Sequence, residues 1–398
     1  MRDAVVPIEK MAAGGDAIAH LPDGKVVFVS GALPGETVEI DVVTSKRDFA
    51  RAVVRRVVEA SPMRVTPSCP EVARGCGGCD WQHVSAAGQQ QWKLDIVVDA
   101  LRRTARMPDA AVRWGGSVPA WGYRTSMRAA GAADGTPGLR AASSNEVVPL
   151  DRCAVLDPAL DQLRRATRCA PGDEVSLRVS SSGRATARFH GAPGSVPSGT
   201  ATGDDAAVVE TVHGVPLRVS AGSFFQSGPA AAELLVSTVR TMIDALPGSA
   251  VQDHLLVDAY GGVGLFSATL GWDPCIVVEG SESACVDAAA NLGDRAVVVC
   301  GAFEEWDAAS VRGRVGVAVV DPARTGMGRR AVEVLVAAAP ETVVLVSCDP
   351  VAMARDVALL GEGGYVHVES VVLDLFPQTH HVEVVTLFER RGSVTSEA

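Results

Sequence analysis

A cysteine near the C-terminus stands where a nucleophile would be expected. The segment Ser347-Cys348-Asp349-Pro350 follows an apolar run, residues 341–346, that is typical of a β-strand, and it opens a segment of helical length. Asp349 suits the N-cap of that helix and Pro350 suits its first position. A helix dipole favours thiolate over thiol at its N-terminus, and the thiolate is the reactive form of cysteine. The pattern predicts a nucleophilic Cys348, with a buried structural cysteine as the alternative interpretation.

A glycine-rich segment further upstream has the features of a cofactor-binding loop. Asp258-Ala259-Tyr260-Gly261-Gly262-Val263-Gly264 follows an apolar run, and its glycines let the backbone approach a ligand closely. Glu279 ends the next apolar run, where a carboxylate can accept hydrogen bonds from ribose hydroxyls. The spacing is not GxGxxG, and S-adenosylmethionine (SAM) satisfies both features without a pyrophosphate. An ordinary tight turn followed by a surface glutamate is the alternative.

Two more carboxyl groups are expected at the same edge of a sheet. Asp321-Pro322-Ala323-Arg324 ends the fourth expected strand, and His380-His381-Val382-Glu383 begins the last one. If the last strand is antiparallel, its start lies beside the Cys348 loop. Glu383 then becomes a candidate general base for the reaction of the thiol, although strand ends also carry exposed glutamates of no special role.

Four other cysteines have a spacing that suits a metal centre. Six residues separate Cys69 from Cys76, two separate Cys76 from Cys79, and Cys153 lies far downstream. Four thiolates can hold an iron–sulfur cluster or a tetrahedral zinc ion, and a single CxxC pair does not choose between them. The remaining cysteines show no ligand spacing and are interpreted as packing residues, because disulfides are not expected in a cytosolic chain; they are Cys169, Cys275, Cys285 and Cys300.

Three regions with different patterns must position these residues. Residues 1–60 contain short β-like runs separated by Gly-Gly, Asp-Gly and Pro-Gly turns, which indicates a small β-barrel. Residues 61–220 form a central region with a helix expected from about 87 to 106, a β-like run at 174–179 and a linker-like stretch at 191–203.

The third region, residues 221–398, is predicted to be an α/β domain of the Rossmann-like type. Apolar strands alternate with helix-length segments, which implies βαβ units and a mainly parallel sheet. Two further strand-like runs, 365–374 and 382–388, have no helix between them, so the last strand is expected to be antiparallel. The five alternating strands are predicted near residues 255–257, 275–278, 297–299, 315–320 and 343–346.

Composition limits the class of protein. The chain has 398 residues, of which 47% are apolar, and this is enough to bury a sizeable core. No apolar run is long enough to span a membrane and no signal peptide is visible, so a cytosolic protein is expected. The net charge of −11 argues against a general polyanion binder, but residues 1–150 carry 18 Lys and Arg against 16 Asp and Glu. Phosphate contact through the basic clusters in that half is one interpretation and a solvated surface is the other.

In combination, these motifs resemble the SAM-dependent RNA uracil-C5 methyltransferases, the family that forms 5-methyluridine. The resemblance covers nearly the whole chain, and its motifs occur in family order. The N-terminal region resembles a TRAM domain, an RNA-binding barrel. The matching segments are Phe224-Phe225-Gln226, residues 258–264, Val278-Glu279, residues 321–324, residues 347–350 and His381-Val382-Glu383.

The resemblance implies a reaction and a site. Cys348 would add to C6 of a uridine in tRNA or rRNA, C5 would take the methyl group, and Glu383 would remove the C5 proton. A base inside a helix is sterically hidden, so the target is expected to be single-stranded or flipped out. The SAM contacts implied are Gln226, Tyr260, Glu279 and Asp321, and the implied ligands of an iron–sulfur cluster, of the 4Fe–4S type, are Cys69, Cys76, Cys79 and Cys153.

Three positions depart from the family pattern. Asp349 replaces the usual Asn, and a carboxylate beside the thiol is expected to raise its pKa and slow its attack. Ala323 replaces a second proline, and Gly261 replaces a frequent cysteine, a change expected to be harmless.

Two rival functions remain at this point. An RNA cytosine-C5 methyltransferase shares the attack at C6, but that class usually has a cysteine where this chain has residues 321–324. A non-catalytic RNA-binding or folding factor could retain the architecture, and the presence of both Cys348 and Glu383 argues against it.

Overall fold

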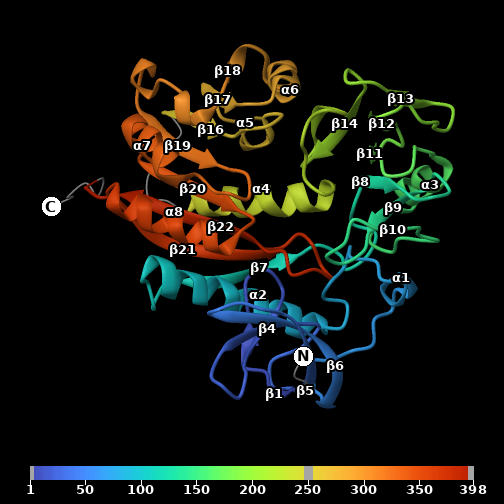
Figure 1. Cartoon of the computed structure of the whole chain (residues 1–398). Helices are drawn as coiled ribbons and strands as arrows, with labels where there is room; N and C mark the ends of the chain where they lie inside the picture. Colours follow the sequence, from blue (N-terminus) through green and yellow to red (C-terminus); the bar gives the residue numbers. More distant parts are fainter. Residues whose placement is uncertain (1–3, 246–253, 393–398) are drawn as a thin grey trace.

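The computed structural model describes residues 4–245 and 254–392. Figure 1 shows a β-rich N-terminal part, a central part in green, and a C-terminal α/β part in orange and red. The N-terminal part is β-rich, as expected from the turn pattern, and forms a six-stranded sheet in the order β1-β5-β6-β4-β3-β2. Its strands are Ala4–Pro7 (β1), Lys10–Met11 (β2), Ala17–His20 (β3), Val26–Ser30 (β4), Thr37–Ser45 (β5) and Phe49–Glu59 (β6).

Helix α2 joins the barrel to the α/β part. It spans Ala86–Ala100, with the Ser85 hydroxyl accepting a hydrogen bond from the Gly88 N–H, and it follows a short helix α1, Pro70–Ala73. Trp92 packs into the barrel core, whereas Val97 packs into the core of the α/β part. The helix expected to reach residue 106 ends as a π-helical turn, Leu101–Ala105. Figure 1 shows α2 lying between the two parts.

The central part is built on a second six-stranded sheet, in the order β10-β9-β8-β11-β12-β13. The run expected at 174–179 is strand β11, and the linker-like stretch holds only the short β13. Helix α3, Pro158–Ala166, is capped by Asp157 and has no counterpart in the sequence prediction. The strands are Ser126–Gly131 (β8), Pro137–Arg140 (β9), Val147–Val148 (β10), Glu174–Val179 (β11), Ala185–His190 (β12) and Thr200–Thr202 (β13), followed by a hairpin of Ala207–Val212 (β14) and Val215–Ser220 (β15).

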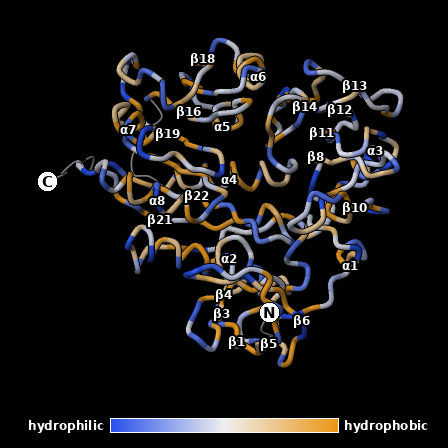
Figure 2. The backbone as a smooth tube through the Cα atoms, in the orientation of Figure 1, coloured by the Kyte–Doolittle hydropathy of each residue, from blue (hydrophilic) through white to orange (hydrophobic). Residues whose placement is uncertain are grey.

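The C-terminal part is an eight-stranded sheet in the order β18-β17-β16-β19-β20-β22-β21-β7. The five predicted parallel strands are present, and β22 runs antiparallel to both β20 and β21, as expected. Most side chains of its central strands are apolar and buried, and Figure 2 shows hydrophobic stretches along them. The strands are Leu255–Ala259 (β16), Cys275–Glu279 (β17), Ala296–Cys300 (β18), Val315–Val320 (β19), Thr342–Ser347 (β20), Tyr365–Asp374 (β21) and Glu383–Arg390 (β22).

Helices cover this sheet between its strands. Pro229–Asp244 (α4) precedes β16, and the others follow the strands in turn. They are Leu265–Leu270 (α5), Glu282–Leu292 (α6), Gly328–Ala338 (α7) and Pro350–Glu362 (α8). The eighth strand comes from the central region: β7, Val112–Ser117, pairs in parallel with β21. No helix in the described part of the chain is long and apolar enough to cross a membrane.

Two cysteines interpreted as packing residues are bonded to each other, so that interpretation was wrong for them. Cys285 on α6 and Cys300 at the end of β18 form a disulfide, with Cα atoms 5.9 Å apart. Helix α6 packs beside β18, and this brings together two residues that are 15 positions apart. Cys169 and Cys275 are buried and free, as packing residues are expected to be.

Candidate active site

One cavity is lined by every residue that the sequence predicted for the reaction and for the methyl donor. It encloses about 470 Å³ at the carboxyl ends of the parallel strands. The predicted residues in its lining are Gln226, Tyr260, Glu279, Asp321, Cys348 and Glu383.

Sheet topology explains why these residues meet. Strands β16, β17, β19 and β20 are parallel, so the segments that end or follow them open at one edge of the sheet. Strand β22 enters this edge from the opposite direction, with Val384 paired to Ser347. The next residues outward are Glu383 and Cys348. The antiparallel last strand therefore brings a carboxyl group to the nucleophile.

Glu279 shapes the glycine-rich loop and also lines the cavity. Its Oε2 accepts a hydrogen bond from the Gly262 N–H at 2.9 Å, and its Oε1 accepts one from the Ser281 N–H at 2.7 Å. A carboxylate oxygen has capacity for more than one hydrogen bond. Glu279 is thus held in place by the backbone and can still accept ribose hydroxyls.

The loop needs a glycine at position 261. A Cβ there would lie 2.7 Å from Val277 Cγ1, closer than real side chains approach. The glycine that replaces the frequent cysteine therefore fits the packing of this loop. The preceding residue, Tyr260, has a φ of 57°, and its hydroxyl donates to Glu304 at 2.6 Å.

Three carboxyl groups lie close together beside the glycine-rich loop. Glu279 and Asp321 line the cavity, and the fully buried Asp258 lies near them. Burial raises the pKa of Asp321 to about 7, and the nearby Asp258 and Glu279 contribute to the rise. Burial also raises the pKa of Asp258 to about 7, although Ser267 donates to this carboxyl through its N–H and its hydroxyl. Carboxyls crowded in this way favour a cationic ligand, and SAM carries a sulfonium.

The thiol of Cys348 is not held as a thiolate, which corrects the expectation from the helix dipole. Burial raises its pKa to about 11, with further contributions from Glu383 and Asp321, while Arg324 acts in the opposite direction. Asp349, the residue suspected of this effect, instead caps α8 by accepting the Val351 and Ala352 N–H groups at 3.0 and 2.8 Å. The direction of the expected shift was right, but the carboxyls responsible are others.

Glu383 is buried in the same lining and is also favoured in its neutral form. Burial raises its pKa well above the ordinary value, Asp321 adds to the rise, and Arg324 opposes it. Arg324 is therefore the cation that acts on both reacting groups. The sequence pattern assigns Arg324 no role of its own, and its place in the Asp-Pro-Ala-Arg motif, two residues after a strand-end proline, is the signal that could have identified it.

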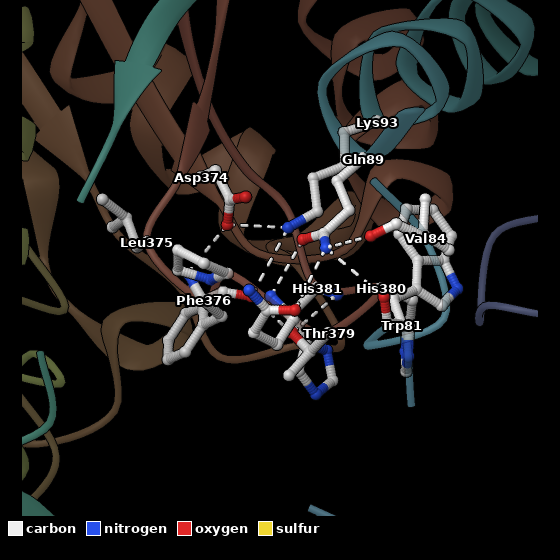
Figure 3. Close-up of polar contacts among 12 residues, drawn as sticks. Trp81, Val84, Gln89, Lys93, Asp374, Leu375, Phe376, Thr379, His380 and His381 are labelled. Carbon is white, nitrogen blue, oxygen red and sulfur yellow. Dashed lines mark hydrogen bonds and ion pairs between the residues drawn. The ribbon is translucent and has the colours of Figure 1, made fainter. Parts of the chain in front are cut away.

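The loop between β21 and β22 is held against α2 by a buried ion pair (Figure 3). Lys93 Nζ lies 2.7 Å from Asp374 Oδ1, and both side chains are almost fully buried. The same ammonium lies 3.4 Å from the Phe376 carbonyl oxygen. Phe376 and His381, both on this loop, line the cavity.

A second residue of α2 fixes the middle of that loop. The Gln89 side-chain oxygen accepts a hydrogen bond from the Gln378 N–H at 2.9 Å, and its amide donates to the Trp81 and Val84 carbonyls at 3.3 and 3.0 Å. Figure 3 shows Gln89 and Lys93 pointing to the loop from the same helix. Because the loop ends at Glu383, these contacts set where β22 begins.

The four predicted metal-ligating cysteines line one other cavity, between α1 and the central sheet. Cys69, Cys76, Cys79 and Cys153 all contribute to it. Burial raises the pKa of Cys79 to about 12 and of Cys153 to about 11, and neighbouring cysteines add to each rise. Within residues 4–245 and 254–392, no three His, Cys, Asp or Glu side chains stand close enough to hold a single metal ion.

Comparisons with known proteins identify the family of the chain. Residues 5–54 match the TRAM domain model, and residues 312–391 match the model of tRNA (uracil-5-)-methyltransferases. An uncharacterized RNA methyltransferase of Streptomyces avermitilis is 32% identical, over 96% of this chain and 97% of its own. A 23S rRNA (uracil(1939)-C(5))-methyltransferase of Shewanella halifaxensis is 31% identical, over 98% and 95%. The chain belongs to the RNA uracil-C5 methyltransferase family.

A solved structure shows that this methyltransferase has the family fold. The tRNA (uracil-54, C5)-methyltransferase of Pyrococcus abyssi, in complex with S-adenosyl-L-homocysteine, matches with a TM-score of 0.68 at 23% identity. The match covers 97% of this chain and 100% of that one. The Rossmann-like domain and the N-terminal TRAM domain predicted from the sequence are therefore confirmed.

Proposed function

We propose that this chain transfers a methyl group from SAM to C5 of a uridine in ribosomal RNA, through a covalent bond to Cys348. The observation that carries the proposal is the meeting of Cys348 and Glu383 in one cavity with the carboxyls of Glu279 and Asp321. Ribosomal RNA is favoured over transfer RNA because two full-length relatives at 31% identity are 23S rRNA enzymes, whereas the tRNA enzyme of similar fold is 23% identical. An RNA substrate also makes the cytoplasm the expected location.

Cys348 and Glu383 have different roles in the proposed reaction. The thiol proton and any proton on Glu383 are first lost to solvent. Cys348 Sγ adds to C6 of the uracil, which makes C5 an enolate-like carbon nucleophile. SAM, when bound, supplies the electrophilic methyl group for that carbon. The ionised Glu383 then takes the proton from C5, the Sγ–C6 bond breaks, the C5=C6 double bond is restored, and the thiolate that leaves is reprotonated. One proton is released over the cycle, because a cationic donor becomes a neutral thioether.

The cofactor end of the cavity is assigned to the residues that surround it. We propose that Glu279 accepts the ribose hydroxyls, that Asp321 and Gln226 bind the amino-acid and base ends of SAM, and that Tyr260 packs against it. Gln226 is 8% exposed and lines the cavity together with the glycine-rich loop, so its amide is available to a cofactor and hardly to solvent.

We also propose that Cys69, Cys76, Cys79 and Cys153 hold an iron–sulfur cluster, of the 4Fe–4S type. The donor set fits, because four thiols line one cavity, and the raised pKa values of Cys76, Cys79 and Cys153 would fall on binding a cation. Ligands of a cluster bind different iron atoms and so stand farther apart than the ligands of one ion. When bound, the cluster would tie the α1 loop to the central region.

RNA has access to the nucleophile from the barrel side. A smaller cavity beside the active site is lined by Ala13 and Gly14 of the barrel together with Arg324 and Cys348. A residue of an RNA-binding domain thus stands next to the reacting thiol, which supports a substrate held by both parts at once.

The test is methyl transfer from labelled SAM to ribosomal and transfer RNA from a strain that lacks 5-methyluridine. Nucleoside analysis and fragment mapping follow, with protein prepared anaerobically. Labelled 5-methyluridine at one position of rRNA is the expected result. Label in tRNA alone would overturn the choice of RNA, and labelled 5-methylcytidine would overturn the base. No label in either RNA would favour a non-catalytic RNA-binding factor.

A further inference from the structure

A second groove lies on the central sheet, outside the active-site cavity. It encloses about 380 Å³ and opens on one face of strands β8, β11 and β12. Each of these strands carries a hydroxyl residue followed two positions later by an arginine. Because side chains alternate between faces of a strand, both residues of each pair point into the groove. The pairs are Ser126 and Arg128, Ser176 and Arg178, and Thr186 and Arg188.

Strand register arranges these pairs into two rows. Ser176 on β11 is opposite Arg128 on one side and Arg188 on the other. Arg178 is opposite Ser126 and Thr186 in the same way. Arginines and hydroxyls therefore alternate in both directions across the sheet. The opposite face holds the apolar core residues Met127, Ala129, Val175, Leu177, Val179 and Ala187.

The groove is cationic. Its lining contains Arg124, Arg128, Arg178 and Arg188, and it contains neither aspartate nor glutamate. At the rim, Glu174 pairs with Arg128 at 2.6 Å, and the exposed Asp204 pairs with Arg188 at 2.6 Å. Solvent-exposed ion pairs of this kind contribute little to stability. A phosphate could therefore replace the carboxylate of Glu174 or Asp204 as the partner of the arginine at little cost in free energy.

Arg178 marks the floor of the groove. Its side chain is 8% exposed, Nη2 donates to the Ser223 carbonyl oxygen at 3.1 Å, and buried Nη1 has no hydrogen-bond partner in the described structure. Glu210, on the neighbouring hairpin, is the carboxyl group that acts on it, and burial raises the pKa of Glu210. Arg178 therefore contributes a fixed positive charge at the base of the groove, which Glu210 partly compensates.

The groove continues into the active-site cavity. Phe224, Phe225 and Phe376 line both. Phe224, at the junction, is 73% exposed, unusually so for an aromatic side chain. Sites for single-stranded nucleic acid combine a cationic groove with exposed aromatic rings.

We propose that this groove binds the phosphates of the RNA strand next to the target uridine. The proposal rests on the proposed function, since it names how the same substrate is held. Guanidinium forks and hydroxyl donors suit phosphate oxygens. The contacts would position the strand without reading its sequence. A single-stranded polymer is favoured over an isolated anion because the cationic surface leads directly to the cavity that holds the nucleophile.

The test is the double variant R128Q/R188Q, whose two side chains lie at the surface of the groove and outside the catalytic lining. A single-stranded RNA oligonucleotide containing the target uridine is the probe. KM for RNA should rise about tenfold, with kcat at saturating RNA and the affinity for SAM unchanged. The slope of log KM against log salt should become shallower by about 1.4, since each lost phosphate contact to a single strand contributes about 0.7.

The matched control is R329Q/R330Q on α7. Both arginines are exposed and paired with carboxylates, and neither lines a cavity described above. The control should keep the wild-type KM and salt slope. A groove variant that behaves like the control would overturn the proposal, and so would equal competition by inorganic phosphate or by an acidic peptide at matched charge.

Failure of the proposed function is distinguished by direct binding. Fluorescence anisotropy of the same labelled oligonucleotide measures Kd without methylation. If no RNA is methylated but R128Q/R188Q still weakens binding about tenfold relative to R329Q/R330Q, the proposed RNA groove is supported and the proposed reaction is overturned. If methylation occurs and RNA binding is insensitive to R128Q/R188Q, the proposed reaction is supported and the proposed RNA groove is overturned.

Discussion

At the scale of single residues, the nucleophilic thiol is neutral before the substrate arrives. Burial raises the pKa of Cys348 to about 11, and burial together with Asp321 raises the pKa of Glu383 well above its ordinary value. Oxidation of cysteine follows thiolate character and exposure, so a half-buried neutral thiol is protected between turnovers. The same environment makes loss of the thiol proton a condition for the first bond to form.

This condition predicts a steep dependence on pH. The pKa of Cys348 is raised to about 11, so the thiolate fraction increases about tenfold per pH unit below that value. We expect kcat/KM for RNA to rise through pH 7 to 9 without a plateau. Methylation at saturating SAM, in buffers of constant ionic strength, measures it, and a flat profile over this range would contradict the assigned protonation state.

Substitutions distinguish the role of Cys348 as nucleophile from the role of Glu383 as base. C348A should abolish methylation because no bond to C6 can form, while SAM binding persists. E383Q should accumulate a covalent protein–RNA adduct, because the C5 proton has no acceptor and the Sγ–C6 bond cannot break. A denaturing gel detects the adduct, and C348A/E383Q, which lacks the nucleophile, is the control. Full turnover by either single variant would falsify its role.

The sequence predicts which residues line the cavity, but it does not predict their pKa values. Strand ends identify Cys348, Glu383, Asp321 and Glu279, because a parallel sheet collects such ends at one edge. The pKa of the thiol depends on how deeply the loop is buried and on carboxyls from other strands. A helix dipole, the signal visible in the sequence, is the weaker effect here.

At the scale of elements, side chains of α2 hold the loop between β21 and β22 in place. Lys93 and Asp374 form an ion pair that solvent hardly reaches. Burial lowers the pKa of Lys93 and raises that of Asp374, so each charge depends on the other. Removing one partner leaves an uncompensated charge, which costs more than removing both.

We therefore expect K93M to destabilise the protein by about 3–5 kcal/mol, and K93M/D374N to recover part of this loss. The side-chain amide oxygen that D374N introduces would still accept the hydrogen bond that the Phe376 N–H makes to Asp374 at 3.1 Å. In K93M, Asp374 binds its proton more tightly in the folded state than in the unfolded state, so stability should fall as pH rises above about 4. Urea unfolding between pH 5 and 8 measures both effects. If the free energy of unfolding lost in K93M does not depend on pH, the Asp374 carboxyl must have become exposed to solvent in the variant.

Strands that form clear apolar runs in the sequence were predictable. Elements whose position or role depends on contacts with other parts of the chain were not. The apolar runs of β16 to β20 gave their positions within a few residues. Helix α3 was missed because its nine residues contain only a narrow apolar stripe between charged positions. The hydroxyl–arginine alternation of β8, β11 and β12 is visible in the sequence, but its meaning required the register that sets the strands side by side.

At the scale of the whole molecule, the proposed cluster would bridge segments far apart in the chain. Cys69, Cys76 and Cys79 lie between the barrel and α2, and Cys153 lies in the central part. We expect C79S to lose most of its iron and to unfold at a lower temperature, because metal binding contributes directly to folding free energy. Iron content, visible absorbance and Tm of anaerobic protein measure this. C169S, a buried free cysteine outside the cavity, should keep all three, and an iron-loaded C79S or a zinc-loaded wild type would contradict the cluster assignment.

Strand β7 imposes an order of events on the synthesis of the chain. Its Val112 pairs with Ser370 on β21, a partner made about 250 residues later. At a translation rate of about 5–20 residues per second, the first strand waits tens of seconds on the ribosome before its neighbour exists. Throughout that interval the edge of β7 is an open template for pairing with a wrong strand. The growing chain is thus most in need of a chaperone before its C-terminal strands emerge, and slowing translation near the C-terminus would lengthen the dangerous period rather than help folding.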